Sequence, residues 1–367
     1  MKHSIYASIA CLFLVACGGS SSTDTTTDTP QTKEALGELL FNDTSLSLTR
    51  NMSCATCHNP EQAFVDTRTN SVGKAVSVGD DGSSLGDRNS PTIGYANFTP
   101  DFDLDDLSGG QFLDGRASNL TEQAKGPFLN AVEMQMPDEA SVIARVQEND
   151  SYVSSMQSLY GATVFDDTDT AYTAIADAIA AFENTNVFFP FDSDFDTNTM
   201  SAAAIRGRVL FRSNAINCVR CHDDRPQNNT LFTNFEYENL GIPINSAVRA
   251  INGHTTDLGL SEHPDVNDGR QDGRFKVSTL RNIAVTGPYM HNGVFQNLKT
   301  VVHFYNTRDV NGSINPETGL AWEAPEVNRA NIVTNDVGDL GLSDAEEDDI
   351  VAFLEALTDA KYESLIP

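Results

Sequence analysis

Basic residues, tryptophan and long apolar runs are all scarce in this chain of 367 residues. It has 23 lysines and arginines against 52 aspartates and glutamates, which gives a formal net charge of -29. A charge of this size and sign argues against nucleic acid as a partner and favours a neutral or basic one. After residue 16 no apolar run is long enough to cross a bilayer, so we expect the body of the protein to be soluble.

Cysteine is also rare, and its surroundings are informative. Four of the six cysteines belong to two C-x-x-C-H motifs, a pattern typical of covalent haem attachment through two thioethers, with the histidine binding iron. The predicted haem-binding residues are Cys54, Cys57 and His58 in the first motif and Cys218, Cys221 and His222 in the second. The alternative is a pair of C-x-x-C zinc or redox sites, but a tetrathiolate zinc site needs no histidine after each second cysteine. We therefore predict two haem c groups.

The other two cysteines lie in an apolar leader. Residues 1–16 resemble a signal peptide of the lipoprotein type, which predicts that Cys17 becomes the lipid-modified first residue of the mature protein. Residues 17–32 are polar and predict a flexible tether. We expect a protein on the periplasmic side that touches the membrane only through this lipid anchor, at the outer membrane.

The two halves of the chain follow the same order of elements. The stretch Gly37–Phe41 precedes the first haem motif on a helical pattern, and Gly207–Phe211 precedes the second. Each half then closes with an amphipathic helix, and the capping box Ser343–Glu346 predicts where the final one begins. With almost no strand pattern, the predicted class is mainly α, with two cytochrome c-like domains at 33–190 and 191–367.

The faces of the closing helices can be named. Apolar residues at helical spacing predict the buried face in each half. These residues are Tyr172, Ile175, Ile179 and Phe182 in the first half and Ile350, Phe353, Leu354 and Leu357 in the second.

Histidine is missing from the whole stretch between His58 and His222. Imidazole is the usual strong ligand for the second face of a haem iron, so the first haem has no such ligand from its own half. Unless Met52, Met134 or Met136 reaches over, we expect its iron to be open to peroxide.

Several further stretches make the chain similar to the bacterial di-haem cytochrome c peroxidase and MauG family over nearly its whole mature length. They are Arg88–Thr92, Phe112–Arg116, Glu122–Ala124, Gly126–Pro127, Val132–Met134 and Thr286–Gly293. The resemblance implies that the N-terminal haem is the peroxide site, that Glu133, Gln123 and Pro127 line its distal pocket, and that the C-terminal haem stores electrons. We expect Glu133 to move protons during peroxide cleavage, with Gln123 as its orienting hydrogen-bond partner.

The same resemblance implies a calcium ion between the two domains. Asn89 would hold it together with the backbone carbonyls of Thr286 and Pro288. This makes calcium a predicted cofactor beside the two haems.

The chain departs from many peroxidases of this family at three places. The loop Val76–Gly82 lacks the distal histidine, so reductive activation should be unnecessary. Leu113 stands where the family usually has a tryptophan relay between the haems, which puts relay-assisted transfer in doubt. Tyr305 stands where peroxidases have the axial methionine of the second haem, and MauG has tyrosine there.

The exchange at position 305 has a physical meaning. A phenolate is a hard, anionic ligand that favours oxidised iron, whereas a thioether favours ferrous iron. Tyr305 is therefore the predicted ligand of the second iron, with Met290 or His291 as alternatives. His303 lies two positions away on the same expected helix and should face elsewhere.

These observations predict a peroxidase that reduces hydrogen peroxide with electrons from a small periplasmic donor, a cytochrome c or a cupredoxin. Two alternatives stay open. One is a MauG-like oxidase that uses peroxide to oxidise side chains of a partner protein, which Tyr305 favours and Leu113 weakens. The other is a di-haem electron carrier without catalysis, which an open iron disfavours.

Overall fold

The computed structural model describes residues 29–225, 230–254, 256–266 and 268–367. The predicted signal peptide, Cys17 and most of the predicted tether lie outside these residues. The described chain is mainly helical, and its one two-stranded ladder is antiparallel β1 (Tyr237–Glu238) with β2 (Phe275–Lys276). The helices are α1 (Lys33–Asn42), α2 (Cys54–Cys57), α3 (Leu120–Leu129), α4 (Glu139–Gln147), α5 (Asp150–Tyr160), α6 (Thr168–Glu183), α7 (Asp194–Thr197), α8 (Ala202–Phe211), α9 (Ser246–Asn252), α10 (Leu298–Thr307) and α11 (Asp344–Glu355).

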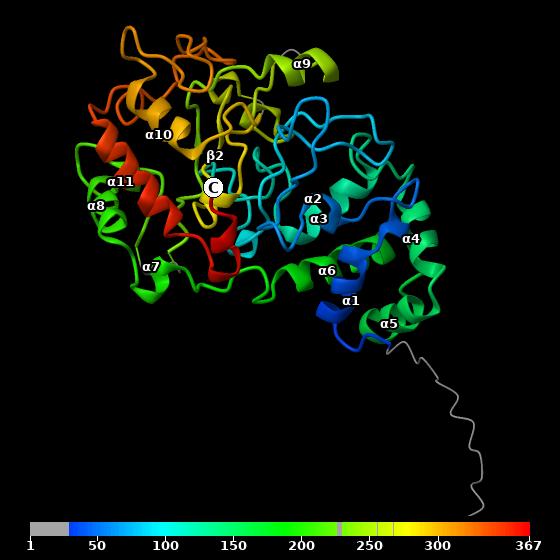
Figure 1. Cartoon of the computed structure of the whole chain (residues 1–367). Coiled ribbons are helices and arrows are strands. Elements are labelled where there is room, and N and C mark those ends of the chain that lie inside the picture. The colour runs from blue at the N-terminus through cyan, green and yellow to red at the C-terminus, as the bar shows by residue number, and fades with distance from the viewer. Residues whose placement is uncertain (1–28, 226–229, 255, 267) are drawn as a thin grey trace, which may run out of the picture.

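The helices gather into two groups that follow the order of the chain. Helices α1 to α6 lie together on one side, and α7, α8, α10 and α11 lie on the other (Figure 1). One hydrophobic cluster uses buried residues from Leu36 to Phe188, and another uses buried residues from Phe211 to Leu357. No helix in the described ranges has the length and apolar character needed to cross a membrane.

The closing helices form as their sequences predict. Asp167 caps α6 through the backbone N–H of Thr170, and all four residues predicted for its buried face are buried. Ser343 and Glu346 form the predicted capping box of α11. The four apolar residues predicted for the last helix are also buried, although Leu357 lies just beyond the end of α11.

Each half is built on a close crossing of two helices. Helix α1 packs on α6 and α8 packs on α11. A Cβ added at Gly37 would lie 1.9 Å from the Ala178 carbonyl oxygen, and one added at Gly207 would lie 1.8 Å from that of Asp349. Glycine is therefore required at both crossings, because the backbone of the partner helix occupies the space of a side chain.

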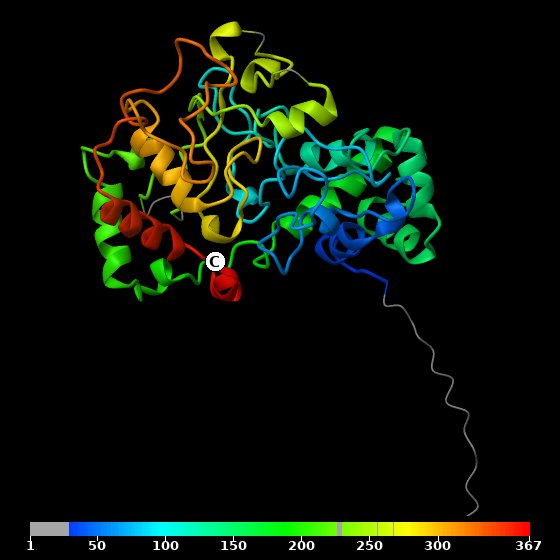
Figure 2. The same ribbon diagram turned by 45° about the horizontal axis from the view of Figure 1, so that its top comes forward.

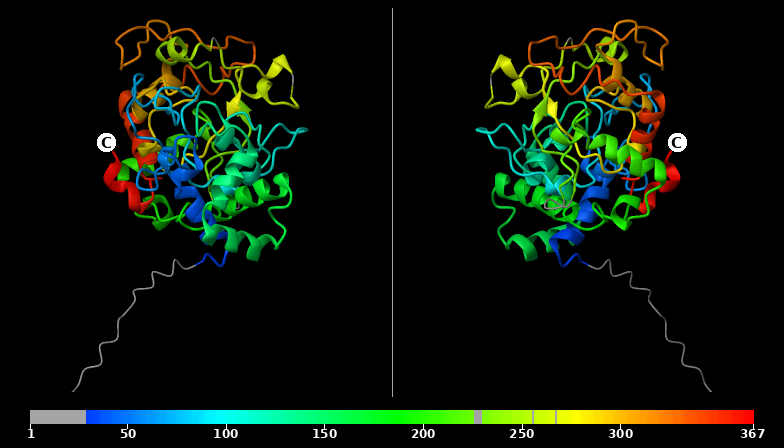
Figure 3. Two further views of the ribbon diagram at one scale, coloured as in Figure 1. Left: turned by 90° about the vertical axis from the view of Figure 1, so that its right-hand side faces the viewer. Right: turned by 90° about the vertical axis from the view of Figure 1, so that its left-hand side faces the viewer.

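Long loops fill the region between the two helical groups (Figure 2). One of these loops contains Arg281, which is fully buried and forms an ion pair with Asp196 at 2.5 Å. The guanidinium also lies over the rings of Tyr95 and Phe232. The loop that follows α10 lies at the opposite end of the molecule from α5 (Figure 3).

The helix crossings give a first prediction. Gly37→Ala and Gly207→Ala should each lower the free energy of unfolding by about 3 kcal/mol or more, because backbone atoms cannot move aside as a side chain can. The control is Gly126→Ala in α3, where the nearest atom is the tip of the Phe112 ring at 3.3 Å. Denaturant unfolding of the haem-loaded proteins measures the difference. Equal free energies of unfolding for all three variants would contradict the conclusion that the partner backbone excludes a side chain at Gly37 and Gly207.

Candidate active site

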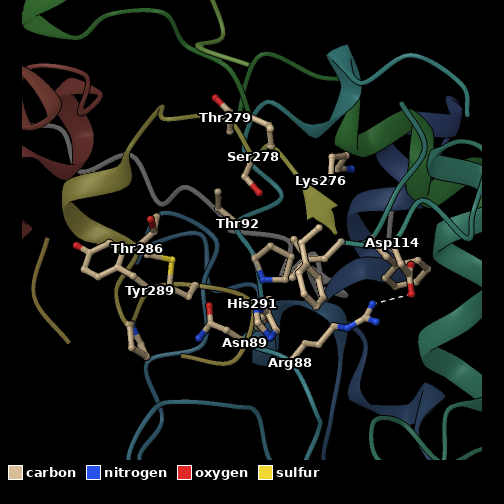
Figure 4. Close-up of a pocket in the computed structure, with 18 of the residues that line it drawn as sticks. Arg88, Asn89, Thr92, Asp114, Lys276, Ser278, Thr279, Thr286, Tyr289 and His291 are labelled. Atoms are coloured by element: carbon tan, nitrogen blue, oxygen red, sulfur yellow. Dashed lines mark hydrogen bonds and ion pairs between the residues drawn. The ribbon is translucent and has the colours of Figure 1, made fainter. Parts of the chain in front are cut away.

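A single cavity of about 1110 Å³ opens between the two halves, and both C-x-x-C-H motifs line it. Its walls combine loops that precede α3 with loops between β1 and α10. Figure 4 shows part of this wall, where Arg88, Asn89 and Asp114 of the first half face Lys276, Thr286 and His291 of the second. Residues of both halves therefore form the cavity wall.

The first haem motif forms the single turn α2 and the residue after it. The His58 backbone N–H donates to the Cys54 carbonyl at 2.9 Å, which places both cysteines and the histidine on one side of the turn. The His58 ring places Nδ1 3.2 Å from the Phe64 carbonyl oxygen. With Nδ1–H donating there, Nε2 keeps the lone pair that an iron ligand needs.

The second motif repeats this geometry. His222 donates its backbone N–H to the Cys218 carbonyl at 2.9 Å, and its Nδ1 lies 2.8 Å from the Phe232 carbonyl oxygen. Phe64 and Phe232 both have left-handed backbone, with φ of 58° and 55°. This uncommon conformation for an aromatic residue aims each carbonyl at its histidine. Burial lowers the pKa of His222 to about 4, so the ring is neutral at pH 7.

The four cysteines of the motifs are unpaired and half-buried at the cavity wall. Burial raises the pKa of each thiol, that of Cys221 to about 11, so these thiols are neutral at pH 7. Among the described residues no three side chains of His, Cys, Asp or Glu converge as a metal site would require. Free thiols, an aimed histidine Nε2 and a large cavity fit two haem c groups, which Cys54, Cys57, His58, Cys218, Cys221 and His222 would hold.

The expected distal residues of the first haem lie together. Gln123 and Pro127 are four residues apart on one face of α3. The turn that carries Glu133 is bonded to this helix, because the Met134 N–H donates to the Pro127 carbonyl at 3.1 Å. All three predicted residues line the cavity.

The partner of Glu133 differs from the prediction. Asn130 Nδ2 donates to Glu133 Oε1 at 2.7 Å, and no hydrogen bond joins Gln123 to Glu133 in the part of the chain that the structure describes. Asn130 is therefore a partner that the sequence did not predict, and the orienting role of Gln123 stays a prediction. Asn130 lies three residues before Glu133 in a turn, and this short spacing was the signal that could have identified it.

Burial raises the pKa of Glu133, while the charge of Arg116 and the bond from Asn130 act against this rise. A carboxyl group with a raised pKa accepts a proton more readily and can return it to a basic leaving group. Oε1 is held by Asn130, so Oε2 is the atom that is free to exchange a proton.

The three methionines near the first motif occupy different places. Met52 and Met134 line the cavity, whereas Met136 lies in the hydrophobic core and does not. The loop that lacks a histidine contributes Ser77 to the cavity wall.

Tyr305 lies on α10 and lines the cavity near the second motif. Burial raises its pKa, and the neighbouring Cys221 and Cys218 raise it further, so only a cation at its oxygen would make it ionise. Met290 and His291 also line the cavity. His291 is stacked on the Phe275 ring at 3.8 Å, which restrains its imidazole.

His303 faces away from the cavity, as predicted. Its Nδ1 lies 2.8 Å from Glu347 Oε1, and His303 is absent from the cavity wall.

Trp322 packs against Phe304 and donates to the Thr307 hydroxyl at 3.1 Å, which is a structural role.

The residues expected to hold calcium line one wall of the cavity. Asn89, Thr286 and Pro288 would supply neutral oxygen atoms, a donor type that calcium accepts. The Asn89 side chain donates through Nδ2 to the Ala75 carbonyl at 3.0 Å, which leaves Oδ1 free. A calcium ion stays a prediction.

The fold and the cavity define a class of protein: mainly helical, with two haem-attachment motifs on one shared cavity. The family described as di-haem cytochrome c peroxidase matches residues 31–203. The chain is 46% identical to the methylamine utilization protein MauG of Paracoccus denitrificans, over 90% of each chain. It is 31% identical to the cytochrome c peroxidase Ccp of Escherichia coli, over 71% of this chain and 50% of that protein.

Two solved structures have a fold similar to that of this chain. The diheme peroxidase BthA of Burkholderia thailandensis superposes with a TM-score of 0.80 at 31% identity, over 91% of this chain and 88% of that one. A MauG-like protein associated with microbial copper homeostasis gives a TM-score of 0.66 at 26% identity, over 93% of both. The chain belongs to the di-haem cytochrome c peroxidase and MauG family, whose members are oxidoreductases.

The two motifs predict two covalent haems per chain. Pyridine haemochrome analysis of the mature protein should give a ratio of two, and Cys54→Ser with Cys57→Ser should reduce it to one. A ratio near one in the unmodified protein would contradict this assignment.

Glu133→Gln should leave both haems attached and slow the reaction with peroxide about a hundred- to ten-thousand-fold, because a positioned acid and base is lost. Rapid mixing with hydrogen peroxide measures the rate. The matched control is Glu122→Gln, since Glu122 is on α3 but bonded to Lys125 at 2.8 Å on the surface. Equal rates in the two variants would exclude a proton-transfer role for Glu133.

Proposed function

We propose that this protein is a di-haem c-type enzyme in which hydrogen peroxide reacts at the N-terminal haem while two electrons come from outside the chain. The balanced reaction takes one peroxide, two electrons and two protons to two waters. The observation that carries the proposal is the Glu133 carboxyl group, which lines the same cavity as Cys54, Cys57 and His58. A non-catalytic electron carrier would have no use for an acid and base at this position.

When bound, the first haem would supply an iron that accepts electrons from the donor and passes them to peroxide. The chain supplies the proton transfers. Glu133 Oε2 takes a proton from one oxygen of the peroxide and returns it to the other, which leaves as water. Gln123 lines the same cavity and would orient peroxide through its amide, and the Pro127 ring would provide an apolar wall without an N–H donor.

The electron donor in this proposal is a side chain of a partner protein, as in a MauG-like oxidase. Two observations support it: Tyr305 lines the cavity beside the second haem motif, and the identity to MauG reaches 46%. A phenolate ligand would keep the second haem oxidised, so that it shares oxidising equivalents with the first without prior reduction.

The second candidate is a peroxidase with a small donor, a cytochrome c or a cupredoxin. Leu113 supports it, because this cavity-lining aliphatic side chain replaces the aromatic relay between the haem positions. The likeness to the diheme peroxidase BthA supports it as well. In either case we place the enzyme on the periplasmic side, anchored to the outer membrane through a lipid on Cys17, with a structural calcium ion at Asn89, Thr286 and Pro288.

Rapid mixing with peroxide distinguishes these functions. We expect the fully ferric protein to react without prior reduction, with a high-spin electron paramagnetic resonance signal from the first haem beforehand. Slow turnover with reduced cytochrome c or azurin indicates the MauG-like activity, and fast turnover indicates the small-donor peroxidase. A protein with only low-spin signals and no reaction would be an electron carrier, contrary to the proposal.

Tyr305→Met should raise the midpoint potential of the second haem, by well over about 100 mV, since axial ligands move haem potentials across roughly 0.8 V. A thioether stabilises ferrous iron, so this variant should need pre-reduction before it reacts with peroxide. Spectroelectrochemical titration measures the potential, and Tyr289→Met is the control, because Tyr289 also lines the cavity. An unchanged potential and low-spin spectrum would show that Tyr305 is not a ligand.

A further inference from the structure

One half-buried cation on the cavity wall forms no ion pair within the part of the chain that the structure describes. Five lysine and arginine side chains line the cavity: Arg88, Arg116, Arg220, Arg249 and Lys276. Each of the four arginines forms an ion pair with a carboxylate. Lys276 forms none within the described ranges, and its ammonium donates only to the Gly110 backbone carbonyl.

The surroundings of Lys276 disfavour an ammonium group that has no counter-ion. Burial lowers the pKa of its ammonium to about 8. Asp114 is the carboxylate whose charge acts on it, but Arg88 Nη1 donates to Asp114 Oδ2 at 2.6 Å and Arg116 Nη1 donates to both Asp114 oxygens. An ammonium has three donors, and a buried charge is stable only when it is paired and hydrogen-bonded. Two donors of Lys276 are left for an anion in the cavity.

The backbone places Lys276 at the seam between the two halves. Its N–H donates to the Leu113 carbonyl at 2.9 Å, in the first half. It belongs to β2, which pairs with β1, and Glu238 of β1 lies 4.0 Å from the Cys221 sulfur and 3.2 Å from Arg220. Figure 4 shows Lys276 among the cavity-lining side chains, above Asp114, which is joined to Arg88 by a dashed line. Lys276 therefore lines the shared cavity on a strand whose neighbour contacts the second haem-attachment motif.

We propose that Lys276 binds a propionate carboxylate of a haem at this seam and that its positive charge raises the potential of that haem. The inference rests on the proposed function, because it requires haems in the cavity. Haem propionates are the carboxylates that two covalently attached haems would bring into this cavity. A charge-assisted hydrogen bond to the propionate would use the remaining N–H donors of Lys276. The nearby positive charge would also stabilise the reduced haem relative to the oxidised haem.

The test uses the haem-loaded protein. Lys276→Gln keeps a donor for the Gly110 carbonyl but removes the charge, Lys276→Arg keeps the charge, and Lys74→Gln is the control at an exposed lysine. Three measurements are made on each: haems per chain, the two midpoint potentials, and the propionate bending modes in resonance Raman spectra. Lys276→Met, which keeps the aliphatic length, repeats the test if the glutamine variant does not accumulate.

We expect Lys276→Gln to keep two haems, to lower the potential of one of them and to shift one propionate mode, whereas Lys276→Arg restores both values toward those of the unmodified protein. A purely structural lysine would change the thermal stability without moving the propionate mode. Two haems with potentials and Raman modes equal to those of Lys74→Gln would overturn this inference and leave the proposed function intact. Fewer than two haems in the unmodified protein would overturn the proposed function itself.

Discussion

The rest of the structure depends on two backbone-to-backbone contacts between helices, one in each half. Gly37 lets α1 touch the backbone of α6 at Ala178, and Gly207 lets α8 touch that of α11 at Asp349. Beside each glycine a phenylalanine packs edge-on against the partner helix, with ring centroids 5.5 Å apart for Phe41 and Phe182 and 5.2 Å for Phe211 and Phe353. Each haem motif follows its helix along the chain, so these rigid crossings determine where both motifs meet the cavity.

The two halves share one histidine geometry. In both, a left-handed phenylalanine turns its carbonyl toward the histidine Nδ1 and leaves Nε2 for iron. The halves differ in the other side chains that they contribute to the cavity wall, where the first provides Glu133 and the second provides Tyr305. A proton-exchanging carboxyl suits a site where peroxide is cleaved, and a phenol suits a site where oxidised iron is held.

Charge pairing dominates the seam between the halves, despite the overall charge of -29. Arg88 of the first half bonds Asp257 of the second at 2.6 Å and Asp114 at 2.6 Å. Arg281 bonds Asp196 within the second half and lies over the Tyr95 ring of the first. These pairs join segments that are far apart in sequence, and removing one partner would leave a buried charge. Lys276 is informative because it forms no ion pair with any described residue, whereas each arginine that lines the cavity does.

The sequence by itself determined the helical class, the two haem motifs, the closing helices and the direction in which His303 faces, because these follow from local spacing and helical periodicity. It also identified Glu133, Gln123, Pro127 and Tyr305 through family resemblance, and the structure brings all four to one cavity. Only the tertiary structure decided that Asn130 holds Glu133, that the carbonyls of Phe64 and Phe232 orient the histidines, and that Lys276 forms no ion pair within the described residues. These features depend on left-handed backbone and on contacts between distant segments, and neither leaves a periodic signal in the sequence.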